Sequence, residues 1–173
     1  MEKILVSACL LGEAVRYDGK DNLVDSPLWQ GWQREGRFVS VCPECAGGLP
    51  TPRPPAEIKS PSADVKRRGA ETQVPDPKDA IRVVTVTGED VTAPFVQGAE
   101  AALRLARDAN IRFAVLKARS PSCGNGQIYD GSFSRTLIEG DGITAALLGR
   151  HGIEVFTEYQ LQQLAERLAQ LEN

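Results

Sequence analysis

The sequence predicts an α/β protein whose helices cover both faces of a mostly parallel sheet. Short apolar runs rich in Ile and Val alternate with amphipathic segments along its 173 residues, and these patterns are typical of buried strands and of helices. Strands that alternate with helices form βαβ units, whose right-handed crossovers place helices on both faces. The length suits a single hydrophobic core. We therefore expect one domain, residues 1–173, with the architecture of a three-layer Rossmann-like sandwich.

The N-terminal part is predicted to contain two strands separated by a helix. Apolar runs over residues 3–8 and 37–41 predict the strands, and each run leads directly into a cysteine. Between them, Ser26 suits the cap and Pro27 the first position of a helix, which Gly36 would end. The two strands therefore deliver two cysteines to the loops that follow them.

A long segment rich in proline and glycine follows the second strand. The composition of residues 46–61 excludes a continuous helix or a central strand. Residues 64–78 are also mostly polar. Both stretches are expected to be loops, which in compact domains are usually functional or mobile at this length. Within the first stretch, Arg53 and Glu57 could form a buried ion pair or contact a substrate.

The C-terminal part alternates strands and helices again. In order, we expect a strand over 81–87, a helix from Asp90 or Thr92 to near Asn110, a strand over 112–117, a helix over 143–150, a strand over 153–156 and a helix over 157–171. The turn-rich residues 118–133 open directly off the middle strand. The last helix is amphipathic, with four leucines expected on its buried side: Leu161, Leu164, Leu168 and Leu171.

Composition and charge narrow the classes of partner and compartment. Lysine and arginine total 20 against 23 acidic residues, which gives a formal net charge of -3 and argues against nucleic acid as a primary partner. The N-terminal apolar run is too short to span a membrane and lacks the layout of a signal peptide. We therefore expect no membrane partner and a cytoplasmic location. In a reducing compartment, the four cysteines are better explained as metal ligands or reactive thiols than as disulfides.

Three cysteines from distant parts of the chain are predicted to converge. Cys9, Cys42 and Cys123 each lie just beyond a predicted strand, and the carboxyl ends of parallel strands meet at one edge of a sheet. Three thiolates leave a coordination position open, as a catalytic metal requires, and soft sulfur ligands favour zinc or an iron-sulfur cluster. The single histidine, His151, follows a predicted helix and is not expected to be a ligand.

Cys45 leaves alternatives open because it forms a C-x-x-C pair with Cys42. The pair could complete a four-cysteine zinc site or take part in thiol redox chemistry. A thioredoxin-like site needs a helix that starts at the first cysteine, and the sequence AGGLPTPRPP that follows is not expected to form one. A zinc-stapled binding module without catalysis remains the main alternative to a catalytic metal centre.

Polar residues near the cysteines are candidates for catalysis. Glu44 lies inside the C-x-x-C pair, where a carboxylate could act as a general acid or base. Ser120 and Ser122 come just before Cys123, so a hydroxyl could face the same pocket, although serines in turns often bond their own backbone.

Other residues near the cysteines could bind a substrate. Gly47 and Gly48 would let backbone N–H groups approach a small ligand closely, or they merely satisfy turn geometry. Arg16 could bind an anionic or carbonyl group while Asp18 orients it, although Asp18 followed by glycine also suits a simple turn.

Four sequence blocks resemble one bacterial family across nearly the whole chain. The blocks are VSACLLG with VRYDG, VCPE followed by GGLPTPRPPAEI, LKARSPSCG, and GDGITAALLGRHGIEVF. The family was long catalogued as a domain of unknown function, and members of it are recognised as iron-sulfur-dependent 2-thiouracil desulfidases. Because the four blocks occur in the same order, the resemblance is specific.

The resemblance implies a 4Fe-4S cluster and a desulfidase reaction. The implied reaction converts 2-thiouracil to uracil and hydrogen sulfide, with water as the source of the nucleophile and no net redox change. The implied partner is a small thiolated base or nucleoside. Cys45 lies outside the implied ligand set, and Ser122 is the weaker candidate for the catalytic serine. By position, the implied residues are Cys9, Cys42 and Cys123 for the cluster and Glu44 and Ser120 for catalysis.

Overall fold

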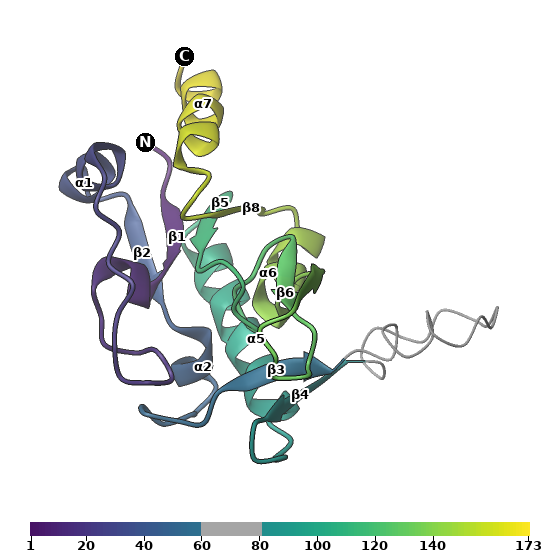
Figure 1. Cartoon of the computed structure of the whole chain (residues 1–173). Helices are drawn as coiled ribbons and strands as arrows, with labels where there is room; N and C mark the ends of the chain where they lie inside the picture. Colours follow the sequence, from purple (N-terminus) through teal and green to yellow (C-terminus); the bar gives the residue numbers. More distant parts are fainter. Residues whose placement is uncertain (60–80) are drawn as a thin grey trace.

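The central sheet has four parallel strands in the order β2-β1-β5-β8 (Figure 1). The structure is a computed structural model that describes residues 1–59 and 81–173, so the polar loop expected over 64–78 lies outside the described residues. In the register of the sheet, Ile4 lies opposite both Phe38 and Phe113. The predicted α/β class and parallel sheet are confirmed. The four strands are β1 (Ile4–Ser7), β2 (Phe38–Val41), β5 (Phe113–Leu116) and β8 (Glu154–Thr157).

Helices cover both faces of this sheet and complete the three predicted layers. Alternate residues of β1 point to opposite faces, as the pleat of a strand requires: Ile4 and Val6 pack with α1 and α7, whereas Leu5 packs with α5 and α6. In the described part of the chain, no helix has the length and apolar character needed to cross a membrane. The helices that form the two outer layers are α1 (Pro27–Arg34), α5 (Thr92–Asp108), α6 (Ile143–Arg150) and α7 (Leu161–Glu172).

The ends of α1 follow the prediction, whereas the burial of the last leucine of α7 does not. Ser26 Oγ accepts a hydrogen bond from the backbone N–H of Trp29 at 3.2 Å, and Gly36 adopts a φ of 69° just after the helix. In α7 the other predicted leucines are buried, but Leu171 is 42% exposed. The prediction for Leu171 was wrong because the last turn of α7 extends past the strands (Figure 1).

Two small antiparallel sheets lie beside the central sheet, and only β4 among their strands was predicted. The expectation that residues 46–61 form only a loop was wrong at β3, since Pro54 and Pro55 precede this strand instead of interrupting it. β6 and β7 have three residues each, too few for an alternating pattern to be recognised. The pairs are β3 (Ala56–Lys59) with β4 (Arg82–Thr85), and β6 (Gln127–Tyr129) with β7 (Leu137–Glu139).

Two single-turn helices follow β1 and β2 directly and carry cysteines. The 3-10 helix η1 (Ala8–Leu11) contains Cys9, and α2 (Pro43–Ala46) begins immediately after Cys42. The expectation that no helix could start at Cys42 was therefore wrong. Pro43 suits the first helical position, and the helix stops after one turn because the two glycines that follow do not continue it.

The backbone of α2 is in direct contact with the backbone of α5. A Cβ added at Gly47 would lie 1.9 Å from the carbonyl oxygen of Pro94, and a Cβ added at Gly98 would lie 1.8 Å from the carbonyl oxygen of Pro43. Only glycine fits at either position, since real side chains never approach backbone atoms so closely. The contact fixes α2, and with it the side chains of the C-x-x-C segment, against the long helix behind the sheet.

Replacing Gly98 with alanine should push α2 away from α5 and destabilise the protein. We expect the free energy of unfolding, measured by urea denaturation, to fall by roughly 1–3 kcal/mol, the usual cost of overpacking. Gly31→Ala is the matched control, because Gly31 lies in α1 with no atom within 4 Å of its Cβ position. That change should leave stability unchanged or raise it by up to about 1 kcal/mol. Equal stability of the two variants would contradict the contact.

Candidate functional site

The turns after three neighbouring strands carry the three cysteines predicted to be ligands. Cys9 lies in η1 after β1, Cys42 follows β2, and Cys123 lies in the turn after β5. Because these strands are adjacent and parallel, all three turns leave the same edge of the sheet. Cys9 and Cys42 lie close enough to Cys123 that a negative charge on either would raise the pKa of the Cys123 thiol. The structure therefore brings the three thiols together, while their role as ligands stays a prediction.

Burial raises the pKa of each of these thiols. It raises the pKa of Cys123 to about 12, against a hydrogen bond from Ser7 that lowers it. It likewise raises the pKa of Cys42 to about 12, and it raises the pKa of Cys9 against a hydrogen bond from Asn22. The neutral thiols are therefore favoured, and thiolates at this edge need a cation to compensate their charge.

The sulfur donors suit a soft metal centre. All four cysteines are free thiols, and thiolates select zinc, copper(I) or iron-sulfur clusters. Within residues 1–59 and 81–173, no three Cys, His, Asp or Glu side chains are arranged to hold a single ion. In a 4Fe-4S cluster each thiolate binds a different iron atom, so three thiols on three separate turns fit this group.

Glu44 lies in α2 beside these thiols and is paired with Arg53. Burial raises the pKa of the Glu44 carboxyl, and the nearby Arg53 guanidinium lowers it in part. Arg53 Nε lies 3.2 Å from Glu44 Oε1. Of the two alternatives for Arg53 and Glu57, the ion pair between them is not formed, because Glu57 Oε1 instead accepts backbone N–H groups of Gly131 and Phe133 at 3.0 and 3.2 Å.

Cys45 lies on the side of α2 that faces the proline-rich loop. Its Sγ is 3.5 Å from Thr51 Oγ1 and 3.9 Å from Arg53 Nη1. It also bonds the thiol of Cys42: its backbone N–H lowers the pKa of that thiol, and its side chain raises it. Cys45 therefore contacts one of the three predicted ligands, Cys42, and also contacts the proline-rich loop.

The two candidate serines have different surroundings. Ser120 Oγ accepts the backbone N–H groups of Ser122 and Cys123, each at 3.1 Å, and so shapes the turn that presents Cys123. Its hydroxyl proton is not used by these bonds. Ser122 is completely buried, and its Oγ lies 2.9 Å from Thr144 Oγ1. The Ser122 hydroxyl thus packs against α6, while its role in substrate binding stays a prediction.

Arg16 and Asp18 form an ion pair in the loop that follows Cys9. Arg16 Nη2 lies 3.1 Å from Asp18 Oδ2, and Arg16 Nη1 donates to Asn22 Oδ1 at 2.9 Å. Asn22 in turn forms a hydrogen bond with the thiol of Cys9. The pair of Arg16 and Asp18 is therefore connected to Cys9 through Asn22. The structure accounts for the two candidate glycines by packing and turn geometry: Gly47 contacts α5, and Gly48 has a φ of 91°.

Several polar residues at this edge were not predicted from the sequence. Ser7 Oγ accepts the backbone N–H of Lys117 at 3.0 Å, which leaves its proton for the thiol of Cys123. Lys117 Nζ pairs with Glu158 Oε1 at 2.7 Å. Ser7 and Lys117 could have been predicted from the sequence, because each is a polar residue at the carboxyl end of a buried strand. Nothing in the sequence marks Asn22, whose place depends on the path of a loop.

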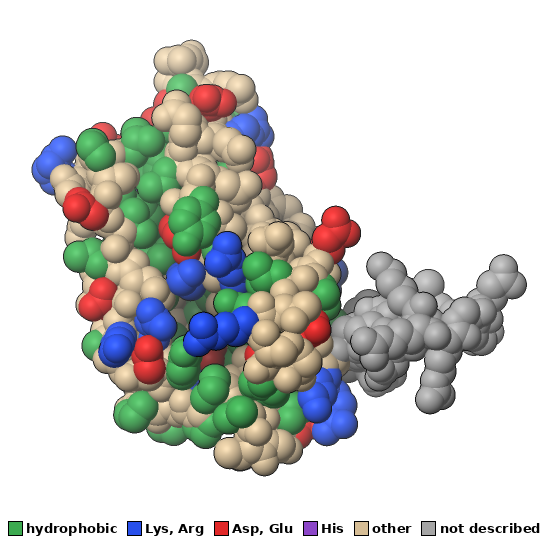
Figure 2. Space-filling view, viewed as in Figure 1, with side chains coloured by type: hydrophobic (Ala, Val, Ile, Leu, Met, Phe, Trp, Pro, Cys, Tyr) green, Lys and Arg blue, Asp and Glu red, His purple; other side chains and the backbone are tan. Residues whose placement is uncertain are grey.

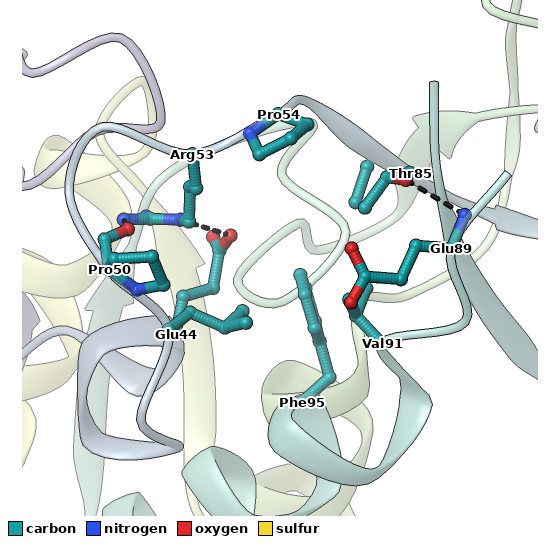
Figure 3. A pocket seen from close by; sticks show the side chains of 10 residues that line it. Glu44, Pro50, Arg53, Pro54, Thr85, Glu89, Val91 and Phe95 are labelled. Atoms are coloured by element: carbon teal, nitrogen blue, oxygen red, sulfur yellow. Dashed lines mark hydrogen bonds and ion pairs between the residues drawn. The ribbon is translucent and has the colours of Figure 1, made fainter. Parts of the chain in front are cut away.

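A pocket of about 180 Å³ opens beside Glu44 (Figure 3). Glu44 and Arg53 lie at one end, Glu89 at the other, and Phe95 rises from α5 between them. On the face drawn in Figure 2, Lys and Arg side chains gather around a hollow near the middle of the molecule. The pocket walls are mostly apolar, and the lining residues are Glu44, Leu49, Pro50, Arg53, Pro54, Ala56, Thr85, Glu89, Val91 and Phe95.

Comparisons with known proteins agree in fold and in family. A model of the family described as 2-thiouracil desulfurase matches residues 4–160. The uncharacterized protein YbbK of Bacillus subtilis (strain 168) is 39% identical over 161 residues, which cover 93% of this chain and 99% of YbbK. The solved structure of TudS, described as a 4Fe-4S-dependent thiouracil desulfidase, is 50% identical with a TM-score of 0.83. That match covers 98% of this chain and 99% of the TudS chain.

In the metal-free protein, Cys42 and Cys123 should react slowly with iodoacetamide, because the thiolate is the nucleophile. With a pKa of about 12, raising the pH from 8 to 10 should increase their rates about 100-fold, against about fourfold for a free thiol of pKa near 8.5. Mass spectrometry of the cysteine peptides measures the rates, and the urea-unfolded chain is the control. Equal rates in the folded and unfolded chains would contradict the burial.

Proposed function

Because the chain belongs to the 2-thiouracil desulfurase family, we propose that it is a 4Fe-4S-dependent enzyme that converts 2-thiouracil and water to uracil and hydrogen sulfide. The solved relative TudS carries this cofactor and substrate class in its description. The observation that supports the proposal most directly is the meeting of one buried thiol, two partly buried thiols and a largely buried carboxylate at one edge of the sheet.

We assign the cluster to Cys9, Cys42 and Cys123, and leave Cys45 outside the ligand set. The raised pKa values of these thiols support this assignment, because a bound cation would offset the cost of ionising them in a buried site. When bound, the cluster supplies a soft Lewis acid that polarises a carbon–sulfur double bond.

Glu44 is assigned the proton transfers, and Ser120 the stabilisation of developing charge. Glu44 takes the two protons of the attacking water in turn, one on attack and one as the carbonyl forms, and returns each to the departing sulfur, so that one water is consumed and one hydrogen sulfide is released. Its raised pKa makes it a stronger base than an ordinary carboxylate. Ser120 Oγ already accepts two N–H groups, so its own proton is free to stabilise charge that develops on the pyrimidine ring.

The substrate is a small thiolated base or nucleoside, and the compartment is the cytoplasm. Arg16 and Asp18 lie in the loop that follows Cys9, where they could border the entrance used by such a molecule. The net charge of -3 does not favour nucleic acid as the primary partner, and four free cysteines suit a reducing compartment.

Glu44→Gln should abolish most of the turnover of 2-thiouracil while the protein keeps its iron. A general base contributes on the order of 10² to 10⁴ in rate, so a loss of that size is expected in a hydrogen sulfide assay under anaerobic conditions. Glu100→Gln is the matched control, because Glu100 is an exposed glutamate of α5. Full activity of the Glu44 variant would remove this residue from the mechanism.

Replacing each cysteine with alanine should distinguish the three cluster ligands from Cys45, which only lies near them. Cys9→Ala, Cys42→Ala and Cys123→Ala should each lose the visible absorbance of the cluster after anaerobic reconstitution, because three thiolates are the only assigned protein ligands. Cys45→Ala should keep iron, sulfide and colour, and it controls for the loss of any thiol. If Cys45→Ala were colourless and one of the other three variants kept its colour, the ligand assignment would be reversed.

A further inference from the structure

We propose that Arg53 is the positioning residue of this site: its guanidinium holds the Glu44 carboxylate in place and ties together the loops that carry Cys9 and Cys42. The part that concerns Glu44 rests on the proposed function, since it assumes that Glu44 is the base. The part that concerns the two loops rests on contacts alone.

The Arg53 side chain is buried and directs its N–H groups to three different segments. Nε donates to Glu44 Oε1 at 3.2 Å in α2. Nη1 donates to the carbonyl oxygen of Pro50 at 3.1 Å and to Thr51 Oγ1 at 3.0 Å, both in its own loop. Nη2 donates to the carbonyl oxygen of Val15 at 2.9 Å, in the loop that follows Cys9.

The burial of this pair distinguishes it from the ion pairs at the surface. The side chain of Arg53 is 5% exposed and that of Glu44 is 18% exposed, whereas the pair of Arg82 with Asp90 is 64% and 47% exposed. Exposed pairs contribute little because water and salt screen them. A buried carboxylate without its partner is strongly disfavoured, so Glu44 depends on Arg53 for its position.

The contacts of Arg53 connect the loop after β1 with the loop after β2. The carbonyl oxygen of Val15 accepts from the Arg53 side chain, and the thiol of Cys42 faces the same oxygen at 4.0 Å. The backbone N–H of Arg53 also donates to the carbonyl oxygen of Tyr17 at 2.8 Å. This backbone bond does not need the guanidinium, so a substitution at position 53 leaves one link between the loops and is compatible with folding.

Arg53 also shapes the pocket beside Glu44. Figure 3 shows its guanidinium beside the Glu44 carboxylate, with Pro50 and Pro54 nearby in the same loop. The same guanidinium therefore sets the orientation of the carboxylate and the position of the proline-rich wall. A lysine cannot do both, because a single ammonium group lacks the planar fork of donors that reaches acceptors in several directions.

A double-mutant cycle tests the role of Arg53 towards Glu44. Arg53→Met should lower kcat for 2-thiouracil about 10- to 100-fold, since small displacements of a catalytic group are this costly, while iron and sulfide content stay at the wild-type level. In the Glu44→Gln background the same change should have no further effect on kcat. Arg53→Lys should recover only part of the lost rate.

The matched control is Arg37→Met. Arg37 has a side chain that is 12% exposed and is paired with Glu35 and Glu172, but it precedes β2 at the opposite edge of the sheet from the cysteines. Its replacement should change kcat less than about twofold, because it contacts no group of the site. An equal loss of kcat for Arg53→Met in the presence and absence of Glu44 would overturn the positioning role, as would an equal loss for Arg37→Met.

Limited proteolysis tests the loop contacts without any assay of activity. Trypsin can cut after Arg16 and Lys20, which lie in the loop that Arg53 holds at Val15. In reconstituted protein, Arg53→Met should be cut there at least about fivefold faster than Arg37→Met, because cleavage follows the population of the opened loop. If the wild type proves inactive on 2-thiouracil, the proposed function fails while this comparison still decides the loop contacts. Equal cleavage rates would overturn them.

Discussion

The parallel pairing of three adjacent strands is the constraint on which the site depends. In β2, β1 and β5 the register keeps all carboxyl ends at one edge of the sheet, so turns that are distant in the sequence open into one place. Cys9, Cys42 and Cys123 each follow one of these strands. If β1 ran antiparallel to its neighbours, its carboxyl end and Cys9 would lie at the opposite edge, and no arrangement of the loops would restore the group of thiols.

Burial is the second constraint, and it explains why the site contains so many paired polar groups. Removing thiols and a carboxylate from water disfavours their charged forms, as the raised pKa values of Cys123 and Glu44 reflect. A buried charge without a partner costs more than a pair contributes. Arg53 therefore accompanies Glu44, a hydrogen bond from Ser7 reaches Cys123, and a cation is the natural companion of the thiolates.

The contacts that sequence reasoning did not foresee share a physical cause, which is the approach of distant parts of the chain. Gly47 has the composition of a ligand-binding turn, yet it is glycine because α5 lies 1.9 Å from where a side chain would begin. Ser122 precedes a cysteine in the same way as Ser120, but its hydroxyl meets Thr144 of α6. Arg53 was matched with a glutamate nearby in sequence, whereas its partner Glu44 is brought to it by α2.

The sequence by itself determined the strands of the central sheet, the longer helices around them and the place of the chemistry. Apolar runs and caps predict the parallel strands and the helices around them, and the position of each cysteine after a strand predicts that the thiols meet, because strand direction and sheet pairing follow from local pattern and general topology. Only the tertiary structure decided which polar groups contact them. Asn22, Arg53 and the contact of α2 with α5 depend on distances of a few ångströms between segments far apart in the chain, and local propensity carries no information about such distances.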